Sequence, residues 1–391
     1  MSTLKVNSIQ HSNGTDALTI DSTGHATFNK TFIPANPLTN RNLIINGDMR
    51  IAQRGTSATG LTNGNTGYHT VDRWKFQHTG TITYAVTMSQ DTDVPSGEGF
   101  SNSVKYDITT AQSSLAAGDS LLFSHYFEGQ MLQHLKKGTT NAESVTLSFW
   151  VKSNKTGTYI AELLDADNSR AISKSYTIDS ADTWEKKSLT FAGDTTGAFV
   201  NDNNTSLALI WWLGAGTDFT SGTLQTSWGT IVNSNRAVGV ANLADSTSNY
   251  INITGVQLEV GDTATEFEHR PYDMELQRCE RYYRKYILGD GTGSEVGITG
   301  FNNTTGEFQG HFHFRTEMRA KPAFDYDGAL SSYRVTYAGG GSTNPTVIQQ
   351  IEQNTWGSGI RVYISGLTAG QASVFRALST GTGAINYDAE L

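Results

Sequence analysis

Residues 145–153 read VTLSFWVKS, and this stretch sets the expectation for the fold. Its apolar side chains, at every second position from Val145 to Val151, alternate with Thr, Ser, Trp and Lys. Successive side chains of a strand point to opposite faces, so the pattern predicts a strand with one face in a core. Four further runs have the same character: TYIAELLD (158–165), WEKKSLTF (184–191), LALIWWLG (207–214) and YINITGVQLEV (250–260). Short strands separated by Gly, Asn, Asp and Ser turns predict an antiparallel β-sandwich or jelly roll over residues 41–270.

The segments on either side of this domain are also β-rich. In residues 1–40, alternating apolar positions at 18, 20, 26 and 28 flank the turn sequence DSTG, which predicts a hairpin. Two strands in water are only marginally stable, so this segment is expected to associate with copies of itself or with a docking partner. Strand patterns resume over residues 290–391 and predict a smaller C-terminal β domain. The predicted fold class is therefore all-β, with two β domains joined by one short helix.

The joining helix is expected within residues 271–289, where the sequence reads PYDMELQRCERYYRKY over 271–286. Pro271 suits the first turn of a helix, and Asp273 and Glu275 suit its positively polarised end. Four residues spaced three or four apart share one stripe of this helix: Leu276, Cys279, Tyr283 and Tyr286. The stripe is either a seam between subunits or a face that packs against the chain's own sandwich.

Composition narrows the function. The 391 residues carry a net charge of -9, only 17% are charged, and 40 are glycine. The one local basic cluster, residues 278–285, is interrupted by Glu280 and tyrosines, which disfavours a nucleic-acid surface. No apolar run approaches the roughly 18 residues of a membrane span. The start lacks a secretory pattern, and the single Cys279 excludes an internal disulfide, as expected for assembly in a reducing cytoplasm.

Several motifs in a fixed order resemble a known family. They are NLIINGDMRIAQRGTS (42–57), VDRW (71–74), VTLSFWVKS, GVQLEVGDTATEFEHRP (255–271) and ELQRCERYYRKY (275–286). This series resembles tail-fibre and related virion proteins of bacteriophages. The opening MSTLKVNSIQHSNGTDALTIDSTGHATFNKT is similar to the amino ends of fibres from phages of cyanobacteria, and EMRAKPAF (317–324) with the closing YDAEL resembles a fibre tip. The resemblance touches all three parts of the chain.

This resemblance implies a homotrimer in the virion tail, with a galactose-binding-like jelly roll of the kind found in carbohydrate-binding modules. It further implies that residues 1–40 attach to other phage tail proteins and that the fibre recognises a host-surface glycan or lipopolysaccharide. The alternative is a purely architectural tail or capsid fibre without receptor binding. A polysaccharide-modifying enzyme, an esterase or a depolymerase, is the third possibility.

The sequence favours a protein that is not an enzyme. Gly118-Asp119-Ser120-Leu121 matches the signature of GDSL esterases, whose serine needs a general base. That base lies in a late Asp-x-x-His in those enzymes, and no histidine here has an aspartate three residues before it. Asp and Glu are plentiful enough for a depolymerase, but the sequence does not show which of them meet.

Sugar binding would use aromatic rings that stack on pyranose faces. The candidates are Trp212, Trp228, Trp356 and Tyr337. Trp228 and Trp356 lie among turn residues, where an exposed indole is notable, and Tyr337 borders the glycine-rich loop 337–345. The alternative for each is a place in a core or a subunit interface, which is the expectation for Trp74, Trp150 and Trp184.

Two sites suggest metal ions. His311 and His313 lie two apart on a predicted strand, so their imidazoles share a face and could surround an ion on a trimer axis. The alternative is an exposed pair above a core face made by Phe312 and Phe314. A structural calcium in the jelly roll would take oxygen ligands from Asn46-Gly47-Asp48 with Glu259 or Asp262.

The assembly prediction follows from the hairpin and the helix stripe. We expect light scattering on the purified protein to give about three times the chain mass of 42.4 kDa. A monodisperse monomer would exclude the trimer and the shared axis.

Overall fold

The computed structural model describes residues 8–10, 16–23, 26–28, 40–290, 297–337, 341–378 and 382–391. Two compact units are present, Met1–Arg41 and Asn42–Leu391. In the first, β1 (Ser8–Gln10), β2 (Asp16–Ile20) and β3 (Ala26–Phe28) form an antiparallel sheet in that order. The predicted hairpin is therefore confirmed as β2–β3, and its turn is held by the Thr23 amide, which donates to the Asp21 carboxylate at 2.9 Å.

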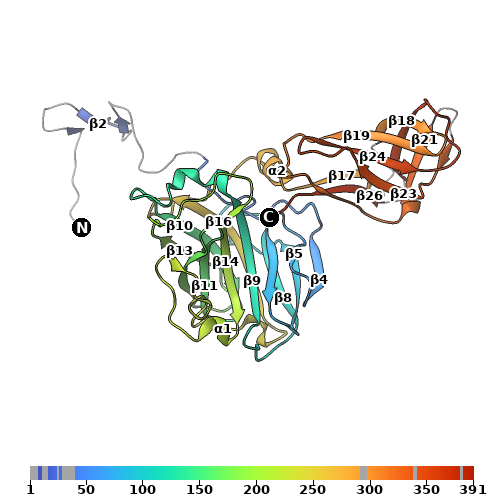
Figure 1. Ribbon diagram of the computed structural model, residues 1–391. Helices are drawn as coiled ribbons and strands as arrows, with labels where there is room; N and C mark the ends of the chain where they lie inside the picture. Colours follow the sequence, from blue (N-terminus) through green and yellow to red (C-terminus); the bar gives the residue numbers. More distant parts are fainter. Residues whose placement is uncertain are drawn as a thin grey trace. The chain divides into compact units, whose positions relative to one another are not determined.

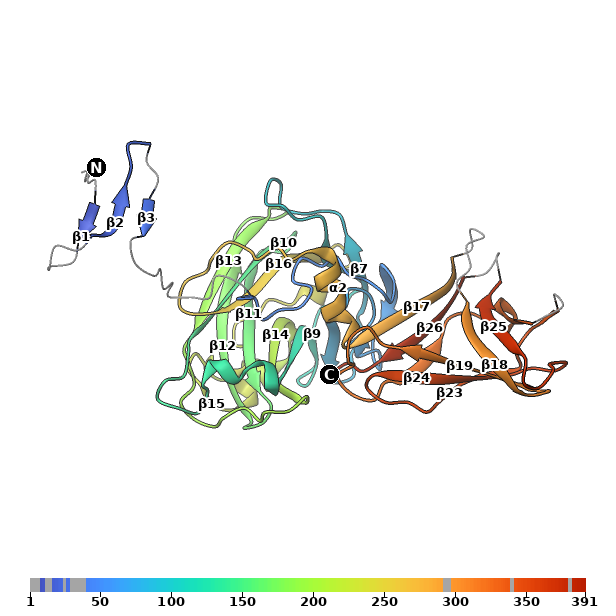
Figure 2. The same cartoon turned by 90° about the horizontal axis from the view of Figure 1, so that it is seen from above.

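The second unit begins with a sandwich of two antiparallel sheets (Figures 1 and 2). The six-stranded sheet has the order β13 (Glu185–Phe191), β10 (Val145–Ser153), β16 (Tyr250–Val260), β8 (Ser103–Thr110), β7 (Ala85–Asp91) and β4 (Ser57–Leu61). The seven-stranded sheet has the order β15 (Gly229–Thr230), β12 (Arg170–Ile178), β11 (Gly157–Asp165), β14 (Thr205–Ala215), β9 (Ser120–Glu128), β6 (Lys75–Thr79) and β5 (Gly67–Tyr68). From β8 to β16 the chain crosses repeatedly between the sheets, as in a jelly roll, so the predicted fold class is confirmed.

Strand β10 has the sequence VTLSFWVKS, and one of its faces lies in the core, as its alternating pattern predicts. The alternate residues of β10 from Val145 to Val151 point into the core, and Phe149 meets the indole of Trp211 edge-on at 5.5 Å. Trp74 stacks on Phe123 with ring centroids 4.6 Å apart. The other four predicted strands are β11, β13, β14 and β16, and each overlaps its predicted run.

The seven-stranded sheet is buried on both faces. Odd-numbered residues of β14 face the sandwich core, and Ala208, Ile210 and Trp212 face the other way. That second face is covered by residues 216–243, which place Phe219 and Ala237 against it. This covering segment contains α1 (Thr217–Thr220) and the short 3-10 turn η3 (Asn233–Asn235), and η4 (Leu243–Asp245) follows. Burial on both faces explains why LALIWWLG has no polar alternation.

The joining helix is shorter than predicted. Helix α2 spans Tyr272–Glu280, and the chain continues as strand β17 (Tyr283–Asp290), so the expected helix over 271–286 is wrong in its second half. The aromatic-rich residues after Arg281 favour an extended strand, because they pair with a neighbouring strand and pack on a sheet face.

The expected subunit seam on this helix is also wrong. Leu276 and Cys279 pack against Ile45, Ile51 and Tyr282 of the same chain. The two remaining seam candidates lie in β17: Tyr283 is buried beneath Arg54, and the Tyr286 hydroxyl donates to the His313 carbonyl oxygen at 2.8 Å. The stripe therefore makes contacts within the chain, as the alternative interpretation predicted, and Tyr283 and Tyr286 do not lie on the helix.

The C-terminal lobe contains two further antiparallel sheets (Figure 1). One has the order β17, β26 (Thr382–Asp388) and β20 (Ala323–Tyr326). The other has the order β22 (Ser342–Thr343), β21 (Tyr333–Tyr337), β25 (Ala372–Ala377), β18 (Ile298–Thr304), β19 (Glu307–His313), β24 (Gly357–Tyr363) and β23 (Val347–Ile351). This lobe contains the short 3-10 turn η5 (Leu330–Ser332), whereas η1 (Gly129–Met131) and η2 (Gln133–Leu135) follow β9 in the sandwich. The lobe begins at β17 and has its own apolar core, but it belongs to the same compact unit as the sandwich, so a separate second domain stays a prediction.

A buried polar junction joins the two lobes. The fully buried Arg73 guanidinium forms an ion pair with Glu390, donates to the Tyr126 carbonyl oxygen at 2.7 Å, and lies 3.4 Å from the ring centroid of Tyr282. Asn46 lies nearby and donates to the carbonyl oxygen of Asp72 at 2.9 Å. The motifs NLIINGD and VDRW are thus structural, because their polar side chains build this junction.

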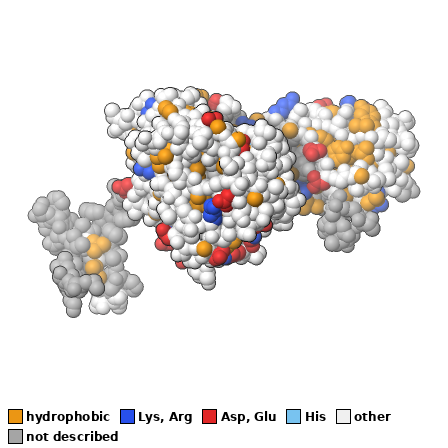
Figure 3. All heavy atoms as spheres, turned by 90° about the horizontal axis from the view of Figure 1, so that it is seen from below, with side chains coloured by type: hydrophobic (Ala, Val, Ile, Leu, Met, Phe, Trp, Pro, Cys, Tyr) orange, Lys and Arg blue, Asp and Glu red, His pale blue; other side chains and the backbone are white. Residues whose placement is uncertain are grey.

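The exposed surface matches the composition. In Figure 3, charged side chains are scattered among uncharged polar atoms, and apolar side chains gather on the C-terminal lobe. The exposed large apolar residues of that lobe are Ile287, Phe301, Val347 and Trp356. No helix among the residues described here is long and apolar enough to cross a membrane.

Asp72 makes the stability of the junction depend on pH. Burial raises the pKa of Asp72 to about 6, although Arg54 and hydrogen bonds from Gln53 oppose the shift. The folded state therefore binds a proton more readily than the unfolded chain, and the contribution of Asp72 to stability grows as the pH falls. Between pH 7.5 and pH 5 this contribution should grow by about 1.4 kcal/mol.

Denaturant unfolding of Asp72→Asn and the wild type at both pH values tests this linkage. The variant should be relatively more stable at pH 7.5 than at pH 5 by that amount. Asp262→Asn, at an exposed carboxylate, is the matched control. A stability difference between Asp72→Asn and the wild type that does not change with pH would contradict the assignment.

Candidate functional site

A cleft opens along one side of the sandwich, where β12 of one sheet lies near the end of β13 of the other. Its volume is ≈ 360 Å³. Strand β12 contributes alternate residues, Arg170, Ile172 and Lys174, which lie on one face of the strand. The remaining lining comes from two loops, Ala192–Thr196 and Thr226–Trp228. We call this site the Trp228 cleft.

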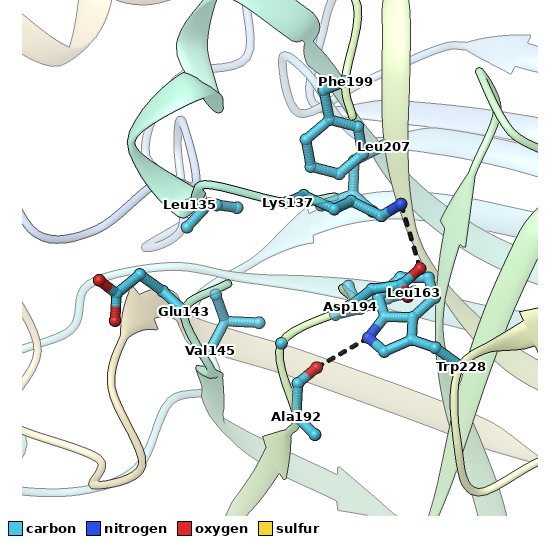
Figure 4. Close-up of a pocket in the computed structure, with 11 residues that line it drawn as sticks. Leu135, Lys137, Glu143, Val145, Leu163, Ala192, Asp194, Phe199, Leu207 and Trp228 are labelled. Atoms are coloured by element: carbon cyan, nitrogen blue, oxygen red, sulfur yellow. Dashed lines mark hydrogen bonds and ion pairs between the residues drawn. The ribbon is translucent and has the colours of Figure 1, made fainter. Parts of the chain in front are cut away.

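The indole of Trp228 is held firmly in the wall of the cleft. Its Nε1 donates to the Ala192 carbonyl oxygen at 2.7 Å, and the half-buried ring packs against the sandwich core (Figure 4). Gln225 lies in the same loop, and its side-chain amide donates to the Ala171 carbonyl oxygen at 2.9 Å. Its main-chain carbonyl oxygen accepts a hydrogen bond from the Ser173 amide at 2.7 Å. These bonds fix the loop on β12, so the ring is oriented before any ligand arrives.

The opposite loop is held by close packing. A Cβ at Gly193 would lie 2.2 Å from the Ala142 carbonyl oxygen, so only glycine fits there. The Gly138 amide donates to the Asp194 carbonyl oxygen at 2.8 Å. Thr195 and Thr196 follow with exposed side chains, and Thr226 and Ser227 face the cleft from the other loop. The cleft therefore combines one aromatic surface with several hydroxyl groups.

A buried charge cluster lies behind the cleft (Figure 4). The Lys137 ammonium is 2.5 Å from the Asp165 carboxylate and 3.1 Å from the Asp194 carboxylate. Arg170 donates to Asp194 through two nitrogens, at 2.7 and 3.0 Å. Burial raises the pKa of Asp194, but hydrogen bonds from Arg170, the Thr196 amide and Lys137 outweigh burial and hold this pKa below its usual value. Asp194 therefore stays ionised and already has two cationic partners.

Behind the indole there is a second, much smaller space. It measures ≈ 20 Å³ and is lined largely by apolar side chains, among them Leu163, Phe199 and Leu207 (Figure 4). A space of this size holds about one water molecule, so a sugar ring cannot enter it. A ligand must therefore meet Trp228 from the open cleft.

The four predicted sugar-stacking residues have different environments. Trp212 is fully buried and donates to Glu162 at 3.1 Å, so its assignment as a stacking residue is wrong. The reason is the covering segment 216–243, which buries the face on which Trp212 lies. Trp228 is half-exposed in a cleft, and Trp356 has 60% of its surface exposed. Tyr337 is half-buried against the core of the C-terminal lobe, and residues 338–340 of the adjoining loop lie outside the described residues.

Three other tryptophans were expected in a core or an interface. Trp74 is fully buried, as predicted. Trp150 and Trp184 are only half-buried, and both lie at the outer surface of the six-stranded sheet. The indole of Trp184 donates to the Asp93 carboxylate at 3.0 Å, so this ring is anchored by a polar contact.

Among the described residues, the two histidines meet no further metal ligand of their own chain, and an ion on a trimer axis stays a prediction. His311 and His313 are exposed on β19 while Phe312 and Phe314 are buried, as the alternative interpretation predicted. His311 lies 3.2 Å from the Glu352 carboxylate. Within the described ranges there is no group of three or more His, Cys, Asp or Glu side chains that could hold a metal ion.

The calcium ligands are engaged elsewhere. The Asp48 carboxylate forms an ion pair with Arg50, and Glu259 accepts hydrogen bonds from Thr265 and Gln257. Asp262 is exposed in the loop that follows β16. The expected calcium site is therefore wrong in its ligands, because these oxygens bind protein donors and do not converge on one point.

The esterase motif is structural. Ser120 begins β9 and is fully buried, and its hydroxyl lies 2.8 Å from that of Thr79. The Asp119 carboxylate accepts the Thr81 amide at 3.1 Å and the Ala116 amide at 3.0 Å. Gly118-Asp119-Ser120-Leu121 thus forms a hydrogen-bonded strand entrance and not a nucleophile open to solvent.

Sequence reasoning found Trp228 but missed the other residues of its cleft. Arg170 and Lys174 follow strand alternation, and the signal that could have identified them is the charge on the same face of β12 as the core residue Ile172. The loop 192–196 carries only a turn signature. This loop and the loop 226–228 line the same cleft only because the fold brings them together.

No protein-family model matches the chain, and no curated protein matches it. Among solved structures, the enzymatically active domain of bacteriophage CBA120 tailspike protein 4 matches 48% of this chain at 19% identity and a TM-score of 0.28. This chain spans 19% of that protein. The module TmCBM61 in complex with β-1,4-galactotriose covers 57% of this chain and 100% of its own at 9% identity and a TM-score of 0.28. The family 11 carbohydrate-binding module of a Clostridium thermocellum cellulase covers 55% and 98% at 8% identity and a TM-score of 0.25. Identities and TM-scores this low show nothing about the function of this chain.

Lys137 is predicted to hold the back of the cleft. Lys137→Met would leave the buried Asp165 carboxylate without its cation, which should lower the free energy of unfolding by about 3 to 5 kcal/mol. The neighbouring Lys136 forms an exposed pair with Glu143, so Lys136→Met is a matched control with an expected loss of roughly 0 to 1 kcal/mol. Equal losses in denaturant unfolding would show that the buried cluster does not hold the site.

Proposed function

We propose that this protein is a glycan-binding structural protein, and that the Trp228 cleft binds a sugar of the host surface. The observation that carries the proposal is a fixed, half-exposed indole in a cleft of ≈ 360 Å³ whose other walls bear hydroxyl and charged groups. An aromatic face packs against the C–H groups of a pyranose, and the surrounding polar groups bind its hydroxyls. This combination is typical of small-molecule sites with few, well-placed polar groups.

The walls of the cleft support the proposal because they are already ordered. Trp228 is bonded to Ala192, Gln225 is bonded to β12, and Gly193 is packed against Ala142. A ligand therefore does not have to order these loops, and the entropic cost of binding falls. Water competes for the hydroxyl groups of a sugar and makes sugar binding weak, so a lower entropic cost raises the affinity noticeably.

The biological role that we propose is that of a bacteriophage tail fibre. The order of motifs along the chain supports this role, together with the amino-terminal segment that resembles virion-attachment regions. In this role residues 1–40 would dock to the particle, three chains would assemble, and the β lobes would meet the host. A purely architectural fibre is the competing proposal, and the absence of any glycan binding would favour it.

We propose binding without catalysis. The one motif with a catalytic signature is buried in a strand entrance, where Ser120 shares its hydrogen bonds with Thr79. In the cleft, Asp194 is held by Arg170 and Lys137, so its carboxylate is engaged in a structural cluster. Neither group is poised as a nucleophile or a general acid.

Two tryptophan variants test the proposed site. The wild type, Trp228→Ala and Trp356→Ala would be applied to an array of bacterial lipopolysaccharides and capsular polysaccharides. Trp228→Ala should weaken binding by about tenfold or more, because it removes the stacking surface. Trp356→Ala removes a more exposed indole and should leave this binding unchanged.

Thermal melting of each variant separates binding from folding. Trp228→Phe keeps an aromatic face, loses the bond to Ala192, and should retain most of the affinity. If Trp356→Ala alone abolished binding, the receptor site would lie in the C-terminal lobe, and the Trp228 cleft would be withdrawn.

A further inference from the structure

We infer that the Trp228 cleft selects an acidic glycan, with Lys174 receiving a carboxylate of the sugar beside the indole. This inference rests on the proposed function of the cleft and adds the chemical class of its ligand. It follows from the charges around the cleft, from the position of Lys174 on β12, and from the acidity of the chain as a whole.

The charged groups of the cleft do not balance. Three cations lie in or behind its wall, Arg170, Lys137 and Lys174, against two carboxylates, Asp165 and Asp194. The two carboxylates are fully used, because Lys137 contacts both of them and Arg170 holds Asp194 through two nitrogens. One positive charge therefore remains, and it belongs to Lys174.

Lys174 has no partner of its own among the described residues. Across the described parts of the chain, its ammonium makes no ion pair, hydrogen bond or cation–π contact, whereas most lysines of the jelly roll pair with a carboxylate. It is only half-exposed, so water solvates it less completely than a lysine on an open surface. An anion that enters the cleft would meet an uncompensated charge in a partly shielded place, where the attraction exceeds that at an open surface.

The position of Lys174 on its strand is unusual. Ile172 and Tyr176, two residues before and after it, are both buried members of the sandwich core. Lys174 shares their face of β12, yet it lines the cleft with Ile172 and Trp228. An apolar side chain would extend the core at this point. The lysine instead directs a charge into the same space that the indole borders.

The overall charge of the protein would not attract an acidic glycan. The chain carries a net charge of -9, so its long-range field repels an acidic polymer. A bound acidic glycan therefore needs a local cationic contact, and at physiological salt such a contact acts over only about 8 Å. The Trp228 cleft supplies this contact next to an aromatic face.

The test compares matched ligands. A panel of acidic bacterial capsular polysaccharides would be titrated into the full chain, each beside its own carboxyl-reduced form, which keeps the linkages and removes the charge. The acidic form should bind about five- to tenfold more tightly, and raising the salt concentration should narrow the difference.

Matched variants assign the effect to Lys174. Lys174→Gln should lower the affinity for the acidic form to that of the carboxyl-reduced form, while Lys174→Arg should keep the preference. Lys321→Gln, at an exposed lysine of the C-terminal lobe, makes the same change in net charge and should have no effect.

The outcomes separate the inference from the proposed function. Equal binding of acidic and carboxyl-reduced forms, with Trp228→Ala still weakening both, would overturn the acidic selectivity and leave the sugar site intact. A preference for acidic forms that survives Lys174→Gln would overturn the role of Lys174. If no polysaccharide binds, or if Trp228→Ala changes nothing, the site itself is wrong and the inference falls with it.

Discussion

A single buried guanidinium, that of Arg73, ties the structure together. It has no exposed surface, pairs with Glu390 near the end of the chain, and lies against the ring of Tyr282 just after helix α2. Its backbone adopts a left-handed conformation (φ 72°), which costs a residue with a side chain on the order of 1 kcal/mol. A charge buried this deeply is costly unless its partners are fixed, so the loss of Glu390 or Tyr282 as a partner of Arg73 would destabilise the junction between the jelly roll and the C-terminal lobe. The lobes are therefore parts of one folded unit.

Local patterns were enough to predict the strands but not everything that covers them. Alternation in VTLSFWVKS gave β10 because one of its faces meets the core and the other meets polar surroundings. The run LALIWWLG gave a strand as well, but the burial of Trp212 depends on residues 216–243 folding back over it. An unbroken apolar strand is itself a sign of burial on both faces, and that sign argued against Trp212 as a stacking residue. The end of α2 was missed because the spacing of Tyr283 and Tyr286 fits a helical stripe, and only the pairing of these residues with β26 shows that they lie in a strand.

The site illustrates why spacing along a chain seldom reveals a cleft. Trp228 was recognisable as an indole among turn residues, but its value depends on neighbours that arrive from β12 and from the loop after β13. The jelly roll brings these segments together in one cleft at the side of the sandwich. The charge pattern has the same origin: Lys174 is an ordinary lysine in the sequence, and only the folded chain shows that Arg170 pairs with Asp194 while Lys174 has no partner among the described residues.

Because the junction between the jelly roll and the C-terminal lobe is polar, it affects how such chains can evolve. An interface built from an apolar seam demands close shape matching, whereas this one depends on a few directed contacts to Arg54, Arg73 and Glu128. Recombination could therefore exchange the whole C-terminal lobe, provided that the incoming lobe supplies an acidic group in place of Glu390; Arg281 lies before β17 and would stay with the helix. Within the described residues, segments 298–313 and 342–363 make none of the ion pairs to Arg54, Arg73 or Glu128, so they would be free to vary without loss of these contacts.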